Sequence, residues 1–170
     1  MDRSIEQTYN IKASPEDVWR ALTDPKEIKE WSGGNAYFIP QPGALYTLWD
    51  GSIGGKVVEA LPQKKLVQTW KPQEWTRTDS VVTFTLTPTK DGTRVDLLHV
   101  NVEDADYDGT TEGWNINYLG VIKKMLEKRT RSTKGTKDAR GARAAKSSKK
   151  ATAKKSKPKA KKSAGKKKRK

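Results

Sequence analysis

The sequence predicts an α+β fold in which a curved antiparallel sheet of about six or seven strands wraps around a long C-terminal helix. Two short helices follow the first strand, and a disordered basic tail ends the chain. Three observations predict this fold: two early helix signals, a hydrophobic period of two from about residue 36 to 103, and a helical period that returns at residue 114. A single sheet of this size buries its apolar face only by curving around the last helix.

The first strand and the two short helices have clear local signals. Residues 4–11 alternate in polarity and are expected to form a strand. In the segment ASPEDVWRALTDP, Ser14 is a good N-cap and Pro15 fits the first helical position. The dipeptide Asp24-Pro25 ends this helix and starts a second short one, KEIKEW.

Six short runs then predict an antiparallel meander. They are AYFI, ALYTLW, KVVEAL, KLVQTW, SVVTFTLT and TRVDLLHV, and segments rich in turn-forming residues separate them. The clearest run is VTFTLT, in which Val82, Phe84 and Leu86 point one way while the threonines point the other. One face of the sheet is therefore expected to cover a core.

The long C-terminal helix follows an expected acidic loop, EDADYDGTTEG. The segment WNINYLGVIKKMLEK has an apolar stripe at helical spacing. The residues of that stripe are Trp114, Tyr118, Val121, Ile122 and Met125.

Charge and aromatic content divide the chain into a domain, residues 1–128, and a tail, residues 129–170. The tail has 20 Lys and Arg and one acidic residue, a net charge of +19. The remaining 15 basic and 19 acidic residues leave the domain near −4. All Trp, Tyr and Phe residues lie in the domain. The tail has too little apolar surface to offset the entropy of ordering, so we expect it to be disordered.

The sequence also limits the chemistry and the location of the protein. There is no cysteine and only one histidine, so we expect no disulfide, no metal site and no cofactor. The N-terminal residues do not resemble a secretory signal, and no apolar run is long enough to span a membrane. We expect a cytoplasmic protein, or a nuclear or nucleoid-associated one if the basic tail directs it there.

Several segments of the domain resemble one known family. SPEDVWRALTDPKEIKEW resembles the opening helices of the activator of heat-shock protein 90 ATPase homologue family, and DGSIGGKVVEALPQKKLVQTW with the following Trp75 resembles its central block. VTFTL, GTRVDLLHV and GWNINYLGVIKKML resemble the remaining strands and the closing helix. The resemblance covers about residues 5–127 and implies a helix-grip fold of the START-like, Bet v 1-like SRPBCC superfamily.

This resemblance implies a C-terminal-type domain of a cochaperone. We expect a non-catalytic, monomeric domain that regulates a heat-shock protein 90 type chaperone or binds an apolar small molecule, and that has no membrane partner. The alternative is a small-molecule enzyme of the same fold, similar to a polyketide cyclase or hydrolase.

The aromatic residues and the single histidine are the candidate ligand-binding residues. They could line a groove under the long helix, although each is equally explained as part of the core. His99 could act as a base if Glu59 or Asp96 lay in reach, but a lone histidine on a strand is more often structural. We therefore expect no catalytic residue. The candidates are Trp49, Trp70, Phe84, His99, Trp114 and Tyr118.

A second candidate site would contact a protein partner. Trp75 follows PQE in an expected turn and has little obvious reason to be buried. An exposed aromatic side chain beside Lys71 and Arg77 would suit a protein contact.

The tail predicts non-specific nucleic-acid binding and has the composition of a linker-histone tail. Its lysines offer point charges for phosphates, and it has no aromatic residue that could stack on a base. A nuclear-import signal or a solubilising tail would explain the same composition. The candidate phosphate-binding residues are Lys149, Lys150, Lys154, Lys155, Lys157, Lys159, Lys161, Lys162, Lys166, Lys167, Lys168, Arg169 and Lys170.

Overall fold

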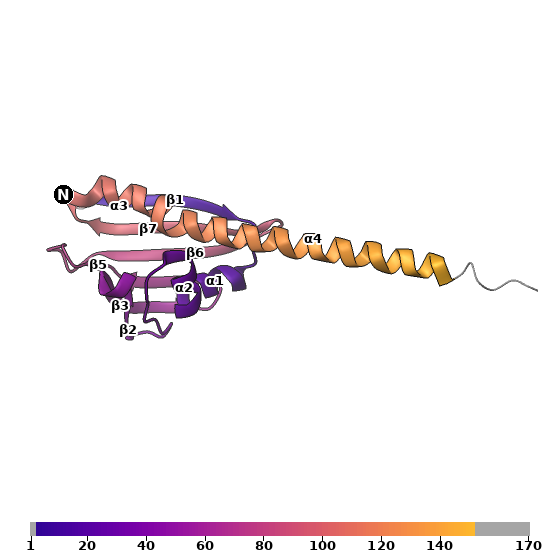
Figure 1. Cartoon of the computed structure of the whole chain (residues 1–170). Coiled ribbons are helices and arrows are strands. Elements are labelled where there is room, and N and C mark those ends of the chain that lie inside the picture. Colours follow the sequence, from indigo (N-terminus) through magenta and orange to yellow (C-terminus); the bar gives the residue numbers. More distant parts are fainter. Residues whose placement is uncertain (1–2, 152–170) are drawn as a thin grey trace, which may run out of the picture. The chain divides into compact units, whose positions relative to one another are not determined.

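A computed structural model describes residues 3–151, and the side chains of residues 3–135. It contains one antiparallel sheet whose strand order is β1-β7-β6-β4-β3-β2, with the short strand β5 paired to β3 (Figure 1). The strands are β1 (Arg3–Ile11), β2 (Leu45–Leu48), β3 (Ile53–Leu61), β4 (Lys65–Thr69), β5 (Lys71–Pro72), β6 (Val81–Thr89) and β7 (Gly92–Val102). The predicted meander is present, and the structure adds an antiparallel pairing of the first strand, β1, with the last, β7.

Two short helices connect β1 to β2. Helix α1 (Pro15–Thr23) begins at Ser14, whose Oγ accepts a hydrogen bond from the Asp17 N–H at 3.1 Å. Helix α2 (Pro25–Ser32) ends at Gly33, which has the left-handed φ of 74° that favours glycine. The Ser14 cap confirms the predicted start of α1. At the predicted start of α2, the Asp24 side chain accepts a hydrogen bond from the Lys26 N–H at 2.8 Å.

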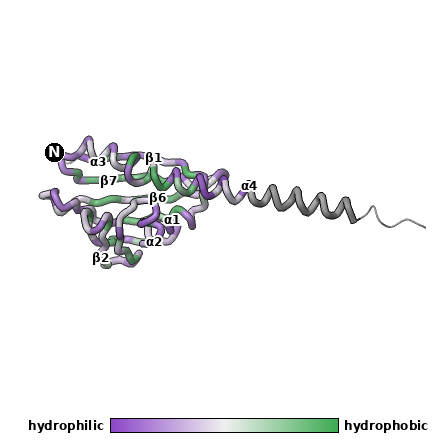
Figure 2. The backbone as a smooth tube through the Cα atoms, in the orientation of Figure 1, coloured by the Kyte–Doolittle hydropathy of each residue, from purple (hydrophilic) through white to green (hydrophobic). Residues whose placement is uncertain are grey.

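Side chains of the central strands alternate between buried and more exposed positions, and the buried ones form the core. On β6, Val82, Phe84 and Leu86 are buried, as predicted, and on β7 the inward positions include Leu97 and His99. Figure 2 shows hydrophobic positions along β6 and β7 and in the first turns of the C-terminal helix. The apolar face of the sheet therefore packs on α1, α2 and the start of that helix.

The C-terminal helical segment has several parts. A 3₁₀ turn, η2 (Asp104–Asp106), and helix α3 (Tyr107–Gly113) lead into a π-helical turn, η3 (Trp114–Tyr118), and then into α4 (Leu119–Ala151). The predicted acidic loop at residues 103–113 is wrong, because most of it is helical. The π-helical turn places both Trp114 and Tyr118 in the core.

Two further expectations differ from the structure. Residues 36–39 are not a strand, since only Tyr37 forms an isolated bridge, to Thr47. Helix α4 also continues through Ala151, although the tail was expected to begin at residue 129. The compact unit that contains the sheet extends to Ser132. Residues 152–170 of the expected tail lie outside the described residues, so their disorder stays a prediction.

Candidate functional site

The domain has an aromatic pocket of about 570 Å³ between the end of α2, the 3₁₀ turn η1 (Trp49–Gly51), the start of β3 and the π-helical turn η3. We call it the aromatic pocket throughout. Its lining residues are Trp31, Ser32, Trp49, Ser52, Ile53, Trp70, Pro72, Glu74, Asp106, Thr110, Gly113, Trp114, Ile116, Asn117, Tyr118 and Val121. This volume suits a small organic ligand.

Tyr118 lies at the centre of the rings that form this pocket. Its ring centroid is 4.7 Å from Trp31, 4.9 Å from Trp114 and 5.9 Å from Trp49. On its other side it stacks on Phe84, with ring planes 19° apart and centroids 5.8 Å apart. Because the π-helical turn positions Trp114 and Tyr118 together, it is the backbone feature that builds the pocket wall.

Trp49 differs from the other rings of the pocket. It is half-buried, whereas Trp31, Trp70, Trp114 and Tyr118 are buried. Its backbone has a φ of 47°, and Asp50 follows with a φ of 55°. A left-handed backbone at a bulky residue is strained, and such strain is often found where a side chain is held for a function.

The predicted ligand-binding residues fall into two groups. Trp49, Trp70, Trp114 and Tyr118 line the aromatic pocket. Phe84 and His99 do not line it, because both are fully buried behind those rings. A role for these two residues in direct contact with a ligand is therefore not supported.

His99 is held by hydrogen bonds at both ring nitrogens. The Trp114 indole N–H donates to Nδ1 at 3.2 Å, and Nε2 lies 2.8 Å from the Ser80 hydroxyl. An indole N–H can only donate, so Nδ1 accepts and the proton of the neutral ring is on Nε2. The Ser80 hydroxyl then accepts from His99 and donates to the Val100 carbonyl at 3.3 Å.

Burial lowers the pKa of His99 to about 3. The ring is therefore neutral at physiological pH. The two carboxylates considered as its partners lie elsewhere: Glu59 pairs with Lys65 at 2.9 Å, and Asp96 pairs with Arg94 at 3.0 Å. His99 is thus a structural residue whose hydrogen bonds connect β7 to the π-helical turn.

Tyr118, which lines the aromatic pocket, is one of three polar side chains that are buried close together. Among the described residues, the Tyr118 hydroxyl and both amide atoms of Gln68 have no hydrogen-bond partner. The Tyr46 hydroxyl donates to the Thr69 carbonyl at 2.6 Å. Burial is the main cause that raises the pKa of Tyr46, the nearby Tyr118 raises it further, and the polar side chain of Gln68 lowers it. The three side chains therefore form one polar cluster inside the domain.

The rim of the aromatic pocket is acidic. Glu74 and Asp106 are the acidic residues of the described lining, which includes no Lys, Arg or His. Asp106 Oδ2 accepts hydrogen bonds from the Trp75 indole N–H at 2.9 Å and from the Thr110 hydroxyl at 3.1 Å. The pocket therefore does not offer a counter-ion to a carboxylate or phosphate ligand.

The expectation that Trp75 is exposed was wrong. It is only 4% exposed, and its ring stacks on His99 with planes 13° apart. The indole N–H bond to Asp106 is what satisfies its polar atom inside the fold. Lys71 and Arg77, its predicted neighbours, are half-buried. The Arg77 guanidinium donates two hydrogen bonds to the Asp79 carboxylate, and both N–O distances are 3.0 Å. A contact with a partner at Lys71 and Arg77 stays a prediction.

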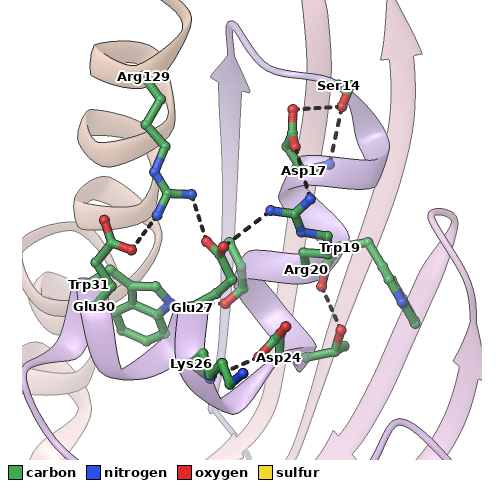
Figure 3. A network of polar contacts seen from close by, with 12 residues as sticks. Ser14, Asp17, Trp19, Arg20, Asp24, Lys26, Glu27, Glu30, Trp31 and Arg129 are labelled. Atoms are coloured by element: carbon green, nitrogen blue, oxygen red, sulfur yellow. Dashed lines mark hydrogen bonds and ion pairs between the residues drawn. The ribbon is translucent and has the colours of Figure 1, made fainter.

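A polar network connects Arg129 of α4 to helices α1 and α2 (Figure 3). The Arg129 guanidinium donates to Glu27 at 2.7 Å and also to Glu30. Glu27 accepts a second hydrogen bond, from Arg20 at 3.2 Å. Arg129 was assigned to the tail by its composition, but these contacts make it part of the domain.

The predicted nucleic-acid-binding residues cannot be placed on any described surface. Their side chains all lie outside the described residues. In the part of the chain that the structure describes, no group of His, Asp and Glu side chains could hold a metal ion. None of the described helices is both long enough and apolar enough to cross a bilayer.

A sheet that curves around a C-terminal helix, with an aromatic pocket beside the start of that helix, defines a helix-grip domain. The family model for "Activator of Hsp90 ATPase homolog 1-like protein" matches residues 12–127. The chain belongs to this family, as its sequence motifs predicted.

Curated relatives carry the same description. The chain is 26% identical over 123 residues to an activator of 90 kDa heat shock protein ATPase homolog from Dictyostelium discoideum, a match that covers 71% of this chain and 32% of the relative. It is 21% identical over 122 residues to homolog 1 from Homo sapiens, covering 71% of this chain and 36% of the relative. The chain thus spans about a third of the length of these relatives.

Two solved structures match this chain over nearly their whole length. A crystal structure of a protein from Mesorhizobium loti is 31% identical with a TM-score of 0.65, and the match covers 74% of this chain and 98% of that one. An HSP90 activator from Plasmodium falciparum is 29% identical with a TM-score of 0.65, and the match covers 74% of this chain and 96% of that one.

Sequence reasoning missed three residues of the site. Trp31 was noted only as part of the predicted helix KEIKEW, Gln68 was not singled out, and Asp106 was part of an expected loop. The signal available for Gln68 was its place in KLVQTW, where it has the inward parity of Leu66 and Trp70. A polar residue at an inward position of a strand is a candidate for function.

Proposed function

We propose that the domain binds a heat-shock protein 90 type chaperone and regulates its ATPase rate. The observation that carries this proposal is the match to the Plasmodium falciparum HSP90 activator, of which this chain covers 96%. The family match over residues 12–127 supports it further. The structural role of His99 favours regulation over catalysis, because both of its ring nitrogens are engaged within the fold.

The most exposed apolar residues offer a surface for this contact. Leu45, on edge strand β2, is 66% exposed, and Tyr37, which flanks that edge, is 57% exposed. Exposed apolar residues next to a sheet edge are typical of protein contacts. We propose this edge as the surface that contacts the chaperone.

The test measures the steady-state ATPase rate of a purified Hsp90-type chaperone from the same organism, with and without the full chain. Wild type should bind the chaperone and change this rate, and Leu45→Glu should weaken both effects at least tenfold. Leu98→Glu is the matched control, since Leu98 is also an exposed strand leucine but lies on β7, far from β2 in the strand order. Equal loss in both variants, or no binding by wild type, would contradict the proposal.

We also propose that residues 129–170 contact nucleic acid without sequence preference and thereby influence where the protein resides. Their net charge of +19 supports this. A gel shift with duplex DNA at two salt concentrations, comparing the full chain with a chain that ends at Ser132, tests it. Binding should depend on the tail and fall steeply with salt, and binding by the shortened chain would contradict the proposal.

A further inference from the structure

The wall of the aromatic pocket includes a buried polar atom that has no partner among the described residues. The Tyr118 hydroxyl is buried, and no described group donates to it or accepts from it. The Gln68 amide, on the inward face of β4, is also unpaired. Leaving a buried polar group without a hydrogen bond is destabilising, and such groups are rare in folded proteins. A fold that keeps both in one region points to a partner from outside the chain.

The residues around Tyr118 indicate the shape and the size of that partner. The walls are the rings of Trp31, Trp49, Trp70 and Trp114, so a flat apolar body would fill the space by stacking. A volume of about 570 Å³ is within the range for small organic ligands.

Charge narrows the class of ligand further. The acidic residues that line the pocket are Glu74 and Asp106, and the described lining offers no cationic side chain. A carboxylate or phosphate would lose its hydration without a counter-ion. A neutral or positively charged ligand would not, and a cation would also be attracted by the indole faces.

A ligand can reach the Tyr118 hydroxyl only if one of the surrounding rings moves. The Tyr118 hydroxyl is covered in the free protein, and of the rings around it Trp49 is the half-buried one. Trp49 is in a 3₁₀ turn and its ring centroid lies 5.9 Å from that of Tyr118, so it is the ring we expect to move when a ligand reaches the hydroxyl.

We infer that the aromatic pocket binds a flat, apolar small molecule that is neutral or positively charged, and that one polar group of this ligand hydrogen-bonds to the Tyr118 hydroxyl beside the Gln68 amide. Binding displaces the ring of Trp49. This inference does not depend on the chaperone proposal, since the ligand could be bound whether or not the domain contacts a chaperone.

The test uses the full chain labelled with ¹⁵N and three naphthalene probes of similar size: 2-naphthol (neutral), 2-(aminomethyl)naphthalene (a cation at neutral pH) and 2-naphthoate (an anion). Proton–nitrogen NMR spectra follow the six indole N–H signals. The neutral and cationic probes should shift the Trp49, Trp31 and Trp114 signals in a saturable way. The anion should bind at least tenfold more weakly.

Substitution of Tyr118 tests the polar contact itself. Tyr118→Phe keeps the ring and should weaken binding of 2-naphthol about five- to tenfold, the effect of losing one hydrogen bond. Its melting temperature should stay the same or rise, because the hydroxyl that is removed has no partner in the free protein. Tyr9→Phe is the control, since the Tyr9 hydroxyl donates to Gln7 on β1 and Tyr9 does not line the pocket; its affinity for 2-naphthol should not change.

Three results would overturn the inference. The first is the absence of saturable shifts with the neutral and cationic probes at millimolar concentration. The second is equal or tighter binding of 2-naphthoate. The third is an unchanged affinity of Tyr118→Phe for 2-naphthol, or a melting temperature lowered by several degrees, which would mean that the hydroxyl already has a partner such as a buried water.

Discussion

The indole N–H of Trp114 donates a hydrogen bond to Nδ1 of His99 across 3.2 Å, and this contact fixes the proton of His99 on Nε2. The π-helical turn supplies Trp114 and strand β7 supplies His99, so the bond joins the C-terminal helical segment to the sheet. Trp75 covers the other side of the imidazole. The only histidine of the chain is therefore a buried connector between elements.

Stability should depend on pH through His99. Burial lowers its folded pKa to about 3, while the unfolded chain binds a proton near the ordinary value. The contribution of neutral His99 is complete above about pH 6.5 and is lost progressively as the pH falls toward 3. Between pH 6.5 and 4.5 it should lower the free energy of unfolding by about 2 kcal/mol. Urea unfolding at both pH values measures this loss.

His99→Gln supplies the comparison for this prediction, because glutamine does not titrate in that range. The variant should be less stable than wild type at pH 6.5, and it should lose about 2 kcal/mol less than wild type on going to pH 4.5. Equal losses in the two proteins would show that His99 is not held neutral in the fold.

Replacing Trp75 should affect stability in proportion to what is removed. Trp75→Ala removes a buried ring and should lower the free energy of unfolding by about 3–5 kcal/mol. Trp75→Phe keeps a ring against His99 but loses the bond to Asp106, so its loss should be about 1–2 kcal/mol. Chemical denaturation measures both. Lys71→Ala, at a half-buried position, is the control and should stay within about 0.5 kcal/mol. A stable Trp75→Ala variant would restore the idea of an exposed contact residue.

The boundary of the domain should lie after Arg129. A chain that ends at Ser132 should unfold like the full chain, whereas a chain that ends at Lys128 should lose about 1–2 kcal/mol because it lacks the bonds from Arg129 to Glu27 and Glu30. Arg129→Gln in the full chain should show a loss of about 1 kcal/mol that shrinks at high salt.

Arg131→Gln is the matched control for the boundary, since the Arg131 side chain donates to the Glu127 carbonyl of its own helix. Its loss should be no more than about 0.5 kcal/mol. Identical stability of the chains ending at Lys128 and Ser132, in thermal and urea unfolding, would place the boundary back at residue 128.

Gly55 should tolerate no side chain. A Cβ there would lie 2.2 Å from the Thr69 carbonyl and 2.7 Å from the Tyr46 ring, so Gly55→Ala should destabilise the protein by about 3 kcal/mol or more. Gly54→Ala is the neighbouring control, because its Cβ would meet only the Tyr46 carbonyl at 3.6 Å, and it should change stability by less than about 1 kcal/mol. Similar losses for the two variants in thermal unfolding would contradict the packing of Tyr46 on β3.

Local signals predicted the elements well. The side chain of Ser14 caps α1, the left-handed Gly33 ends α2, and the inward parity of Phe84 on β6 is as expected. Each of these depends on neighbours within a few residues. Two segments were predicted wrongly: residues 36–39 as a strand and the acidic segment as a loop. The apolar composition of the first and the acidic composition of the second do not by themselves decide whether a segment forms a strand, a helix or a loop.

The candidate site was predicted in part. Trp49, Trp70, Trp114 and Tyr118 were expected in a groove, and they line the pocket. Sequence could not separate them from Phe84, because all five are large apolar residues and only packing decides which of them faces a space.

The sequence by itself determined the helix caps, the inward positions of the strands and the concentration of positive charge after residue 128, since these depend on residue type and short spacing. Tertiary structure alone decided that His99 is neutral and enclosed, that Trp75 is buried and that Arg129 belongs to the domain. It also decided that the Tyr118 hydroxyl has no partner among the described residues. The reason is distance along the chain. His99 contacts Ser80, and Arg129 contacts Glu27, although the residues of each pair are too far apart in the sequence for a local pattern to predict the contact. Burial and hydrogen bonding are properties of that assembled environment, and they give identical residue types different roles.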